Sequence, residues 1–332
     1  MSKEAPNIKT APLEEKQPKS AKNVIFTILK VMISAALIYY LVSRADVGKI
    51  WAAFTGANMS LIALSFMLHG IGYFSSSYRW HLLLKDQGWD IPVGYLVRSY
   101  AVAMFFNNLL PSTIGGDGYR AFDCAKAGVP KSKSLAIVLV ERFLGMFALM
   151  MFAVVAFGLA AGMISRTEQL WIWAVAIFVV MSSGVWLLFF KGFDIGKLPV
   201  KLPGASVINK VFGKIQDAFS PFKGRTRVLT WTMLISLGFQ LNVIFHYYLI
   251  SQALGLDIRF GYFLVFIPLS IFIQIIPISI NGIGVREGIY VSFLTDMLGK
   301  ASVEQSLAFS WIAYGMILLL GVLGGIIYAT RK

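Results

Sequence analysis

Long apolar runs alternate with short polar stretches along most of the chain. A membrane-spanning helix needs about 20 mainly apolar residues to cross a hydrocarbon core about 30 Å thick. Six runs reach that length, and we predict that each is a full span. They are Val24–Val42, Ser60–Ser77, Ser134–Gly162, Leu170–Phe190, Leu229–Ile250 and Val303–Ala329.

Two further apolar runs are interrupted. Tyr95–Leu110 and Phe260–Ile276 each run into a proline and then a glycine-rich polar stretch, after which Ile114–Ala125 and Ile283–Leu298 follow as shorter segments. We interpret each pair as a re-entrant hairpin, in which a half-helix returns to the side from which the chain entered. The chain is then an all-α polytopic membrane protein with about eight full or broken spans. The alternative is that proline and glycine merely kink ordinary spans.

The two interrupted segments repeat one motif. Pro111 to Arg120 and Pro277 to Arg286 align without a gap at an offset of 166 residues and share the pattern P-x-[ST]-I-x-G-x-G-x-R. Three full spans separate the hairpins, so the second must enter from the opposite side of the membrane. This predicts an inverted repeat, an organisation common among secondary transporters. The predicted units are residues 23–165 and residues 166–332.

Composition agrees with a membrane protein. Hydrophobic residues make up 57% of the chain, charged residues only 14%, and the mean hydropathy is +0.72. A soluble fold could not cover so much apolar surface, which excludes a soluble enzyme and a nucleic-acid-binding protein. A single cysteine, Cys124, excludes an internal disulfide and leaves no zinc cluster to consider.

Positive charge predicts the orientation, because cytoplasmic loops carry an excess of lysine and arginine. The net charge is +14, and basic residues gather in the loop 191–228 and at the C-terminus. Residues 1–22 have the composition of a disordered tail. We therefore predict a multi-pass protein of the cytoplasmic membrane with both termini in the cytoplasm. Within 191–228, apolar positions from Val207 to Phe219 share one helical face, which indicates either an interfacial helix on anionic lipid or a helix packed on the protein itself.

Two arginines occupy equivalent places in the hairpins. Arg120 and Arg286 each follow a Gly-x-Gly. An ionised side chain at the centre of a span costs roughly 2.5–3.5 kcal/mol, so these groups must form ion pairs or line a wet cavity. Converging backbone amides and two guanidiniums suit a phosphate, which arginine can bind bidentately. We expect both arginines to bind the phosphate of a lipid head group in one shared cavity; the alternative is that they form structural ion pairs with Glu141, Asp117 or Glu287.

Glu141 and Arg142 are adjacent within a predicted span and therefore cannot simply pair with each other. We expect one to meet the first hairpin and the other the second repeat. Polar and glycine positions around the two breaks complete the candidate substrate-binding set, although any one of them can instead satisfy backbone freed by the break. Those positions are Asn107, Asn108, Thr113, Gly116, Asp117, Gly118, Ser279, Asn281, Gly282, Gly284 and Glu287.

Signals of catalysis are weak. The histidines His69, His81 and His246 are scattered and make no metal pattern, and we expect His246 to bond a neighbouring helix. His81 and Asp86 have an acyltransferase-like spacing, but they lie in what the pattern predicts to be a short basic loop. We therefore expect no enzyme activity, no metal and no cofactor.

The motifs at Asn107–Pro111 and Gly115–Arg120, the pair Glu141-Arg142, and Pro277 with Asn281–Glu287 resemble the lysylphosphatidylglycerol synthase transmembrane-region family. That family includes the flippase-like domain of the multiple peptide resistance factor. The resemblance covers the chain from about residue 22 and implies lipid translocation between leaflets without a cofactor. A C-terminal aminoacyl-transfer domain like that of the full-length factor is not present in this sequence.

The predicted function is thus movement of a phosphate-bearing phospholipid or glycolipid across the cytoplasmic membrane by alternating access. Its partners would be the membrane lipid as substrate, anionic lipid at the cytoplasmic face and no nucleic acid. Two alternatives stay open: an intramembrane lipid-modifying enzyme, and a structural partner for a cell-envelope lipid enzyme.

Overall fold

The computed structural model describes residues 21–109, 114–160, 213, 217–275 and 278–331. The described elements are helical, as the apolar runs predict. Before the first break they are α1 (Ala21–Val42), α2 (Val47–Thr55), α3 (Met59–Asp86) and α4 (Val93–Leu109), followed by α5 (Ile114–Lys126) and α6 (Lys131–Ala160). The later part holds η2 (Ser220–Phe222), α9 (Thr226–Ala253), α10 (Phe260–Ile275), η3 (Ile280–Gly282), α11 (Val285–Val291), η4 (Ser292–Met297) and α12 (Val303–Thr330).

Four described helices, α3, α6, α9 and α12, are long and apolar enough to cross a membrane. A fifth candidate is the end of α1 together with α2, which are bent by 85° at the break between them. Asp46 caps α2 by accepting hydrogen bonds from the backbone amides of Gly48 and Lys49, which explains why a helix forms where the apolar pattern predicts only a loop. The predicted span Leu170–Phe190 lies outside the described residues, as does most of the loop 191–228.

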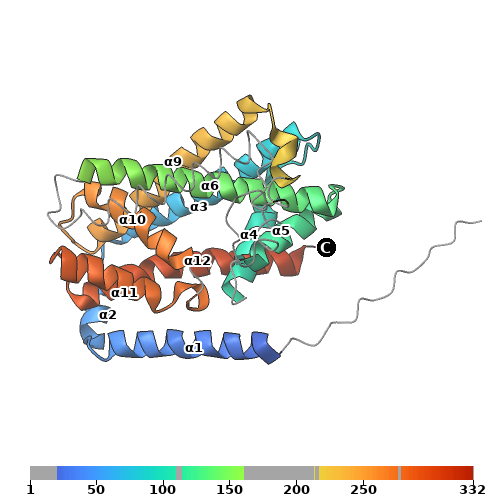
Figure 1. Ribbon diagram of the computed structural model, residues 1–332. Coiled ribbons are helices and arrows are strands. Elements are labelled where there is room, and N and C mark those ends of the chain that lie inside the picture. The colour runs from blue at the N-terminus through green and yellow to red at the C-terminus, as the bar shows by residue number, and fades with distance from the viewer. Residues whose placement is uncertain (1–20, 110–113, 161–212, 214–216, 276–277, 332) are drawn as a thin grey trace, which may run out of the picture.

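Both interrupted segments form a helix, a break and a second helical piece. α4 and α5 match the predicted limits of the first hairpin closely. The second differs after its break: residues 283–298 form the short helix α11 and then a π-helical turn, η4, instead of one half-helix. Figure 1 shows α4 and α5 toward the end of the bundle that holds the C-terminus and the start of α1, whereas α10 and α11 lie toward the end that holds α2.

The helices pack across the predicted repeats. α3 lies against α9, α4 against α12, and α10 against α6. The first helix of each hairpin thus packs on the last span of the other unit. Two units with related folds would be expected to show this reciprocal packing. Glycine makes one contact possible, because a Cβ at Gly324 of α12 would collide with the backbone carbonyl of Ala101 in α4. The division of the chain at residue 165 stays a prediction.

Two local predictions differ from the structure, and at one described end the structure favours one of two open alternatives. α1 already begins at Ala21, so residues 21 and 22 are helical, while residues 1–20 lie outside the described part. α3 continues to Asp86 because its first stop signal is Gly88 with a φ of +94°, so His81 and Asp86 lie in a helix and not in a loop. The described end of the amphipathic segment packs on the protein itself, since Phe219 is only 1% exposed within a core cluster.

Candidate functional site

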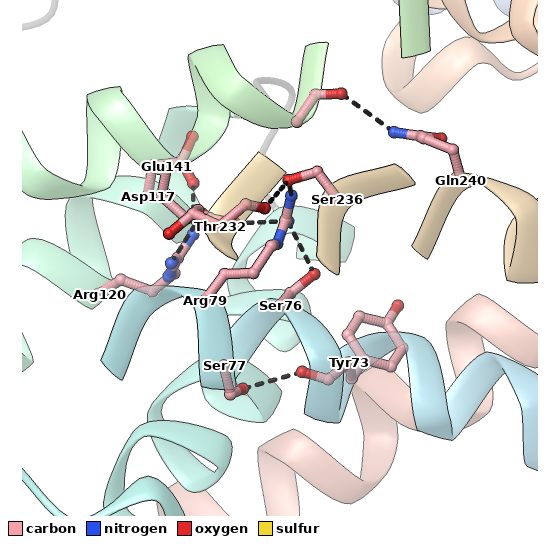
Figure 2. Close-up of polar contacts among 11 residues, drawn as sticks. Tyr73, Ser76, Ser77, Arg79, Asp117, Arg120, Glu141, Thr232, Ser236 and Gln240 are labelled. Atoms are coloured by element: carbon pink, nitrogen blue, oxygen red, sulfur yellow. Dashed lines mark hydrogen bonds and ion pairs between the residues drawn. The ribbon is translucent and has the colours of Figure 1, made fainter. Parts of the chain in front are cut away.

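A buried carboxylate lies in the interior of the helix bundle beside the first hairpin. Glu141 of α6 is 2% exposed. Its Oε1 accepts a hydrogen bond from Nη2 of Arg79 at 2.6 Å, and its Oε2 accepts one from Nη2 of Arg120 at 3.0 Å. Figure 2 shows these side chains converging from α3, α5 and α6. One carboxylate therefore joins three helices, with each of its oxygens bound to a different guanidinium.

The ion pairs continue toward the surface. Nη1 of Arg120 lies 3.5 Å from Oδ1 of Asp117, and Oδ2 of the same carboxylate pairs with Nη1 of Arg142. Exposure rises along the series: the side chain of Arg120 is 3% exposed, that of Asp117 is 17% and that of Arg142 is 38%. We call these five residues, Arg79, Glu141, Arg120, Asp117 and Arg142, the charged cluster.

Aromatic rings enclose the buried part of the cluster. The Arg120 guanidinium carbon lies 4.4 Å from the ring centroid of Trp80 and 4.5 Å from that of Tyr100. Such cation–π contacts strengthen when water is excluded. Trp80 itself is fully buried. Arg120 is thus held between two carboxylates and two rings, which fixes its guanidinium in one place.

Arg79 is the cluster member that sequence reasoning missed. Its Nη1 donates to the hydroxyl of Ser236 in α9 at 2.6 Å, and its Nη2 also donates to Ser76 at 3.2 Å. The predicted span ended at Ser77, which left Arg79 at the membrane edge. The signal that would have found it is the absence of any helix terminator before Gly88.

Glu141 and Arg142 both contact the first hairpin, Glu141 through Arg120 and Arg142 through Asp117. The two positions of α5, 117 and 120, lie one turn apart and so can receive both partners. The contact of one of them with the second repeat stays a prediction. A connection to α9 runs through Arg79 and its bond to Ser236.

The second hairpin holds its arginine differently. Arg286, 6% exposed, donates from Nε to Oε1 of Gln274 at 3.0 Å and from Nη2 to the backbone oxygen of Asn281 at 2.8 Å. The ring of Tyr314 lies 4.4 Å from its guanidinium carbon. Its Nη1 is buried without a hydrogen-bond partner among the described atoms. In contrast to Arg120, the described contacts of Arg286 are with neutral groups.

Glu287 is a capping residue and not a partner of Arg286 in the described contacts. Its Oε2 accepts from the backbone amide of Gly284 at 2.6 Å, and its Oε1 accepts from Ser310 of α12 at 2.9 Å. The alternative prediction is that the arginines form structural ion pairs. Arg120 does so with Glu141 and Asp117, whereas no ion pair between Glu287 and Arg286 is among the described contacts.

Left-handed backbone shapes the second break. Asn281, Gly282 and Gly284 have φ values of 51°, 74° and 83°. Glycine suits such angles, and a Cβ at Gly284 would lie 2.6 Å from the Cβ of Leu37 in α1. The motif glycines here thus serve the turn and the close approach of α1.

The tips of the two hairpins touch. Nδ2 of Asn281 donates to the backbone oxygen of Asn108 at 3.3 Å, and Nδ2 of Asn108 donates to the backbone oxygen of Ile317 in α12 at 3.2 Å. Within the first hairpin, Oδ1 of Asn107 accepts from the amide of Gly116 at 2.8 Å. These side-chain amides form hydrogen bonds with the backbone around the breaks. Of the two predicted roles, substrate binding and satisfying the freed backbone, the contacts show the second.

The remaining candidates are scattered. Gly118 is exposed with open space around it, Ser279 is 7% exposed with a hydroxyl that lacks a partner among the described atoms, and Thr113 lies outside the described residues. Arg120 and Arg286 share no partner in the described contacts, so each belongs to the network of its own hairpin. These contacts do not place the two arginines in one shared cavity.

The family model for the lysylphosphatidylglycerol synthase transmembrane region matches residues 27–325. The chain belongs to this family. It is also similar to a UPF0104 membrane protein of Methanothermobacter thermautotrophicus, with 24% identity over 92% of this chain and 94% of the relative. A UPF0104 membrane protein of Pyrococcus horikoshii is 25% identical over 92% of this chain and 97% of the relative. The chain is therefore a multi-pass membrane protein.

Proposed function

We propose that this membrane protein moves a phosphate-bearing lipid between the leaflets of the bilayer. The observation that carries the proposal is the charge of the cluster beside the first hairpin. Three guanidiniums, those of Arg79, Arg120 and Arg142, are in contact with two carboxylates, those of Asp117 and Glu141. Guanidiniums bind phosphate oxygens bidentately, so a lipid phosphate that reaches this cluster would meet several donors within one network.

The order of exposure supports a route for that anion. Arg142 is the most exposed member of the cluster and Arg120 lies among the most buried. A lipid phosphate would first replace Asp117 as the partner of Arg142, because a guanidinium binds phosphate and carboxylate with the same fork of N–H groups. Asp117 would then shift its interaction toward Arg120, which it already approaches at 3.5 Å.

In the second hairpin, Arg286 is a second candidate partner for the lipid phosphate. The Nη1 donor of Arg286 lacks a described partner inside the protein, so it is available to an anion that reaches it from the other half of the molecule. Among the described residues of the hairpin tips, Asn281 and Asn108 share a hydrogen bond of 3.3 Å. A weak contact at this point can break and reform as the two halves rock, as alternating access requires.

The orientation and the partners belong to the same proposal. The start of α1 and the end of α12 lie at one end of the bundle (Figure 1), and we place that end in the cytoplasm because of the basic loops predicted there. The cytoplasmic membrane is the proposed location, with anionic lipid at its inner face and a cell-envelope lipid enzyme as the proposed supplier or consumer of the cargo.

The test is a leaflet-specific assay in reconstituted vesicles. Fluorescent phosphatidylglycerol, phosphatidylethanolamine and a phosphate-free glycolipid are placed in one leaflet, and their arrival in the other is followed. We expect the phosphate-bearing lipids to move, and Arg142→Gln to slow them by about tenfold or more, since a hydrogen bond to a charged group is worth about 1.5–3 kcal/mol. Lys85→Gln, an exposed surface variant at 58% exposure, is the control.

Equal movement of the phosphate-free lipid, or an unchanged rate in a folded Arg142→Gln protein, would reject the phosphate role. Product analysis of the same vesicles separates the proposal from its rival. A transporter returns the lipid chemically unchanged, whereas an intramembrane lipid-modifying enzyme does not.

A further inference from the structure

A small cavity of about 100 Å³ lies between α3, α4 and α9, beside the charged cluster. Ser76, which lines it, accepts a hydrogen bond from Arg79 of the cluster, and Tyr100, which also lines it, stacks on Arg120. The cavity is large enough for water, since one water molecule occupies about 30 Å³ in the liquid. Its polar lining comprises His69, Tyr73, Ser76, Tyr100, Asn242 and His246.

Two imidazole rings face each other in this cavity. The ring centroids of His69 and His246 are 4.9 Å apart, although the residues are far apart in the sequence and looked scattered there. His246 is 1% exposed. The Nε2 atoms of both rings are buried and have no hydrogen-bond partner among the described atoms. Such orphaned polar atoms are rare in proteins and call for an explanation.

The hydrogen bonds of His246 are compatible with a tautomer that leaves Nε2 as a proton acceptor. Its Nδ1 lies 2.6 Å from the hydroxyl of Ser65, and that hydroxyl also donates to the backbone oxygen of His246 at 3.0 Å. All three atoms are satisfied when the hydroxyl donates to the carbonyl and Nδ1–H donates to the hydroxyl oxygen. In that tautomer Nε2 carries a lone pair, on the ring that lines the cavity. The predicted bond of His246 to a neighbouring helix is present, but it leaves the other nitrogen unused.

A polar seam joins the histidine pair to the charged cluster. On α3, positions 69, 73, 76 and 79 follow one another at intervals of three or four residues, so His69, Tyr73, Ser76 and Arg79 share one face. Ten residues of helix span about 15 Å, roughly half the hydrocarbon thickness. Arg79 then contacts Glu141 directly. The seam thus reaches from the histidine pair to the carboxylate that holds the first hairpin.

We propose that the His69–His246 pair binds a single proton whose passage drives or regulates lipid movement, an inference that rests on the proposed function. A hydronium ion transfers a proton to Nε2 of His246 and leaves as water, and the ring becomes an imidazolium. The second ring, 4.9 Å away, opposes a second positive charge, so the pair takes up one proton. Tyr73 on α3, Tyr100 on α4 and Tyr247 on α9 are the titratable groups that surround the pair.

Coupling between proton binding at the histidine pair and the charged cluster is expected from electrostatics. Among the described contacts neither imidazole meets a carboxylate. The charged groups at the other end of the seam are Arg79, Arg120 and Glu141, and from α12 the Met316 sulfur contacts Ser65. A buried imidazolium without a counter-ion is costly. A positive charge on the pair also repels the guanidiniums of Arg79 and Arg120, and Ser76 and Tyr100 connect the cavity to both of them. Protonation is therefore expected to change how these arginines hold Glu141.

The test compares lipid movement under imposed pH gradients. In vesicles that contain a pH-sensitive dye, we expect the wild-type rate to change several-fold with the gradient, and lipid movement to be accompanied by proton flux. His69→Gln and His246→Gln should lose both effects. His81→Gln is the matched control, because this third histidine bonds the backbone oxygen of Ile91 away from the cavity. A gradient dependence that survives both cavity substitutions would overturn the inference.

A second measurement does not need lipid transport. The chain has three histidines, so ¹⁵N-histidine NMR of the full chain in nanodiscs gives three ring systems that the three single variants assign. We expect one cavity ring to protonate while its neighbour stays neutral, and removal of either ring to change the titration of the other. Independent titration of the two, or none, rejects the proton site. If the rings titrate as a pair but no lipid moves, the proposed function fails and the proton site stands.

Discussion

The two hairpins carry the same motif, but the arginine of the first contacts carboxylates and that of the second contacts neutral groups. In the first, Arg120 lies between the carboxylates of Glu141 and Asp117, within a cluster that extends to Arg79 and Arg142. In the second, the described contacts of Arg286 are an amide oxygen, a backbone oxygen and an aromatic ring. The motif therefore determines where the chain breaks, whereas the neighbouring helices determine the contacts of the arginine. For this reason the proposed contact with a lipid phosphate is expected at the first hairpin.

The largest effect is expected from Glu141→Gln. The substitution leaves the guanidiniums of Arg79 and Arg120 buried without their shared carboxylate, and removing one partner of a buried ion pair costs about 3–5 kcal/mol. Thermal unfolding in detergent would show a large fall in stability. A midpoint near that of the wild type would mean that Glu141 does not hold the first hairpin together.

Glu287→Gln is the matched change in the second hairpin, and its cost should be smaller. Glu287 accepts hydrogen bonds from neutral groups, the amide of Gly284 and the hydroxyl of Ser310. Glutamine keeps one acceptor oxygen, so the loss is confined to one charge-assisted hydrogen bond, worth about 1.5–3 kcal/mol. The same unfolding measurement compares the two variants. A greater loss for Glu287→Gln than for Glu141→Gln would reverse the proposed contrast.

Gly116→Ala tests the close packing of the first hairpin. A Cβ at this position would lie 2.5 Å from the backbone oxygen of Ala103 and 2.5 Å from Oδ1 of Asn107. Overpacking of this kind costs about 1–3 kcal/mol. The neighbouring Gly118 has open space around it, so Gly118→Ala is the control and should unfold close to the wild type.

The smallest effect on stability is expected from Asn281→Gly at the tip of the second hairpin. Glycine adopts the φ of 51° more readily than asparagine, but the substitution removes the 3.3 Å hydrogen bond to Asn108. The two contributions oppose each other, and the net change should stay within about 1 kcal/mol. The lipid-movement assay is more informative: a changed rate at unchanged stability shows that contact between the hairpin tips matters for the cycle.

Sequence reasoning predicted the elements well and their partners poorly. Apolar runs and the proline–glycine breaks located α3, α4, α5, α9 and α12 because span length and backbone strain are local properties. They could not show that Asp117 receives both Arg120 and Arg142, since that depends on how α5 and α6 pack. Arg79 was missed because the apolar run ends before the helix does. His69 and His246 meet only because α3 and α9 lie side by side.

The most direct measurement of the central claim is the proximity of lipid phosphorus to arginine nitrogen in the membrane. Solid-state NMR of ¹⁵N-arginine-labelled protein in anionic bilayers, with ³¹P dephasing, reports guanidiniums within a few ångströms of a phosphate. We predict a dephased signal that disappears in Arg142→Gln and persists in Arg225→Gln, an exposed variant outside the cluster. An identical spectrum for wild type and Arg142→Gln would contradict the claim that the first hairpin's charged cluster receives the lipid phosphate.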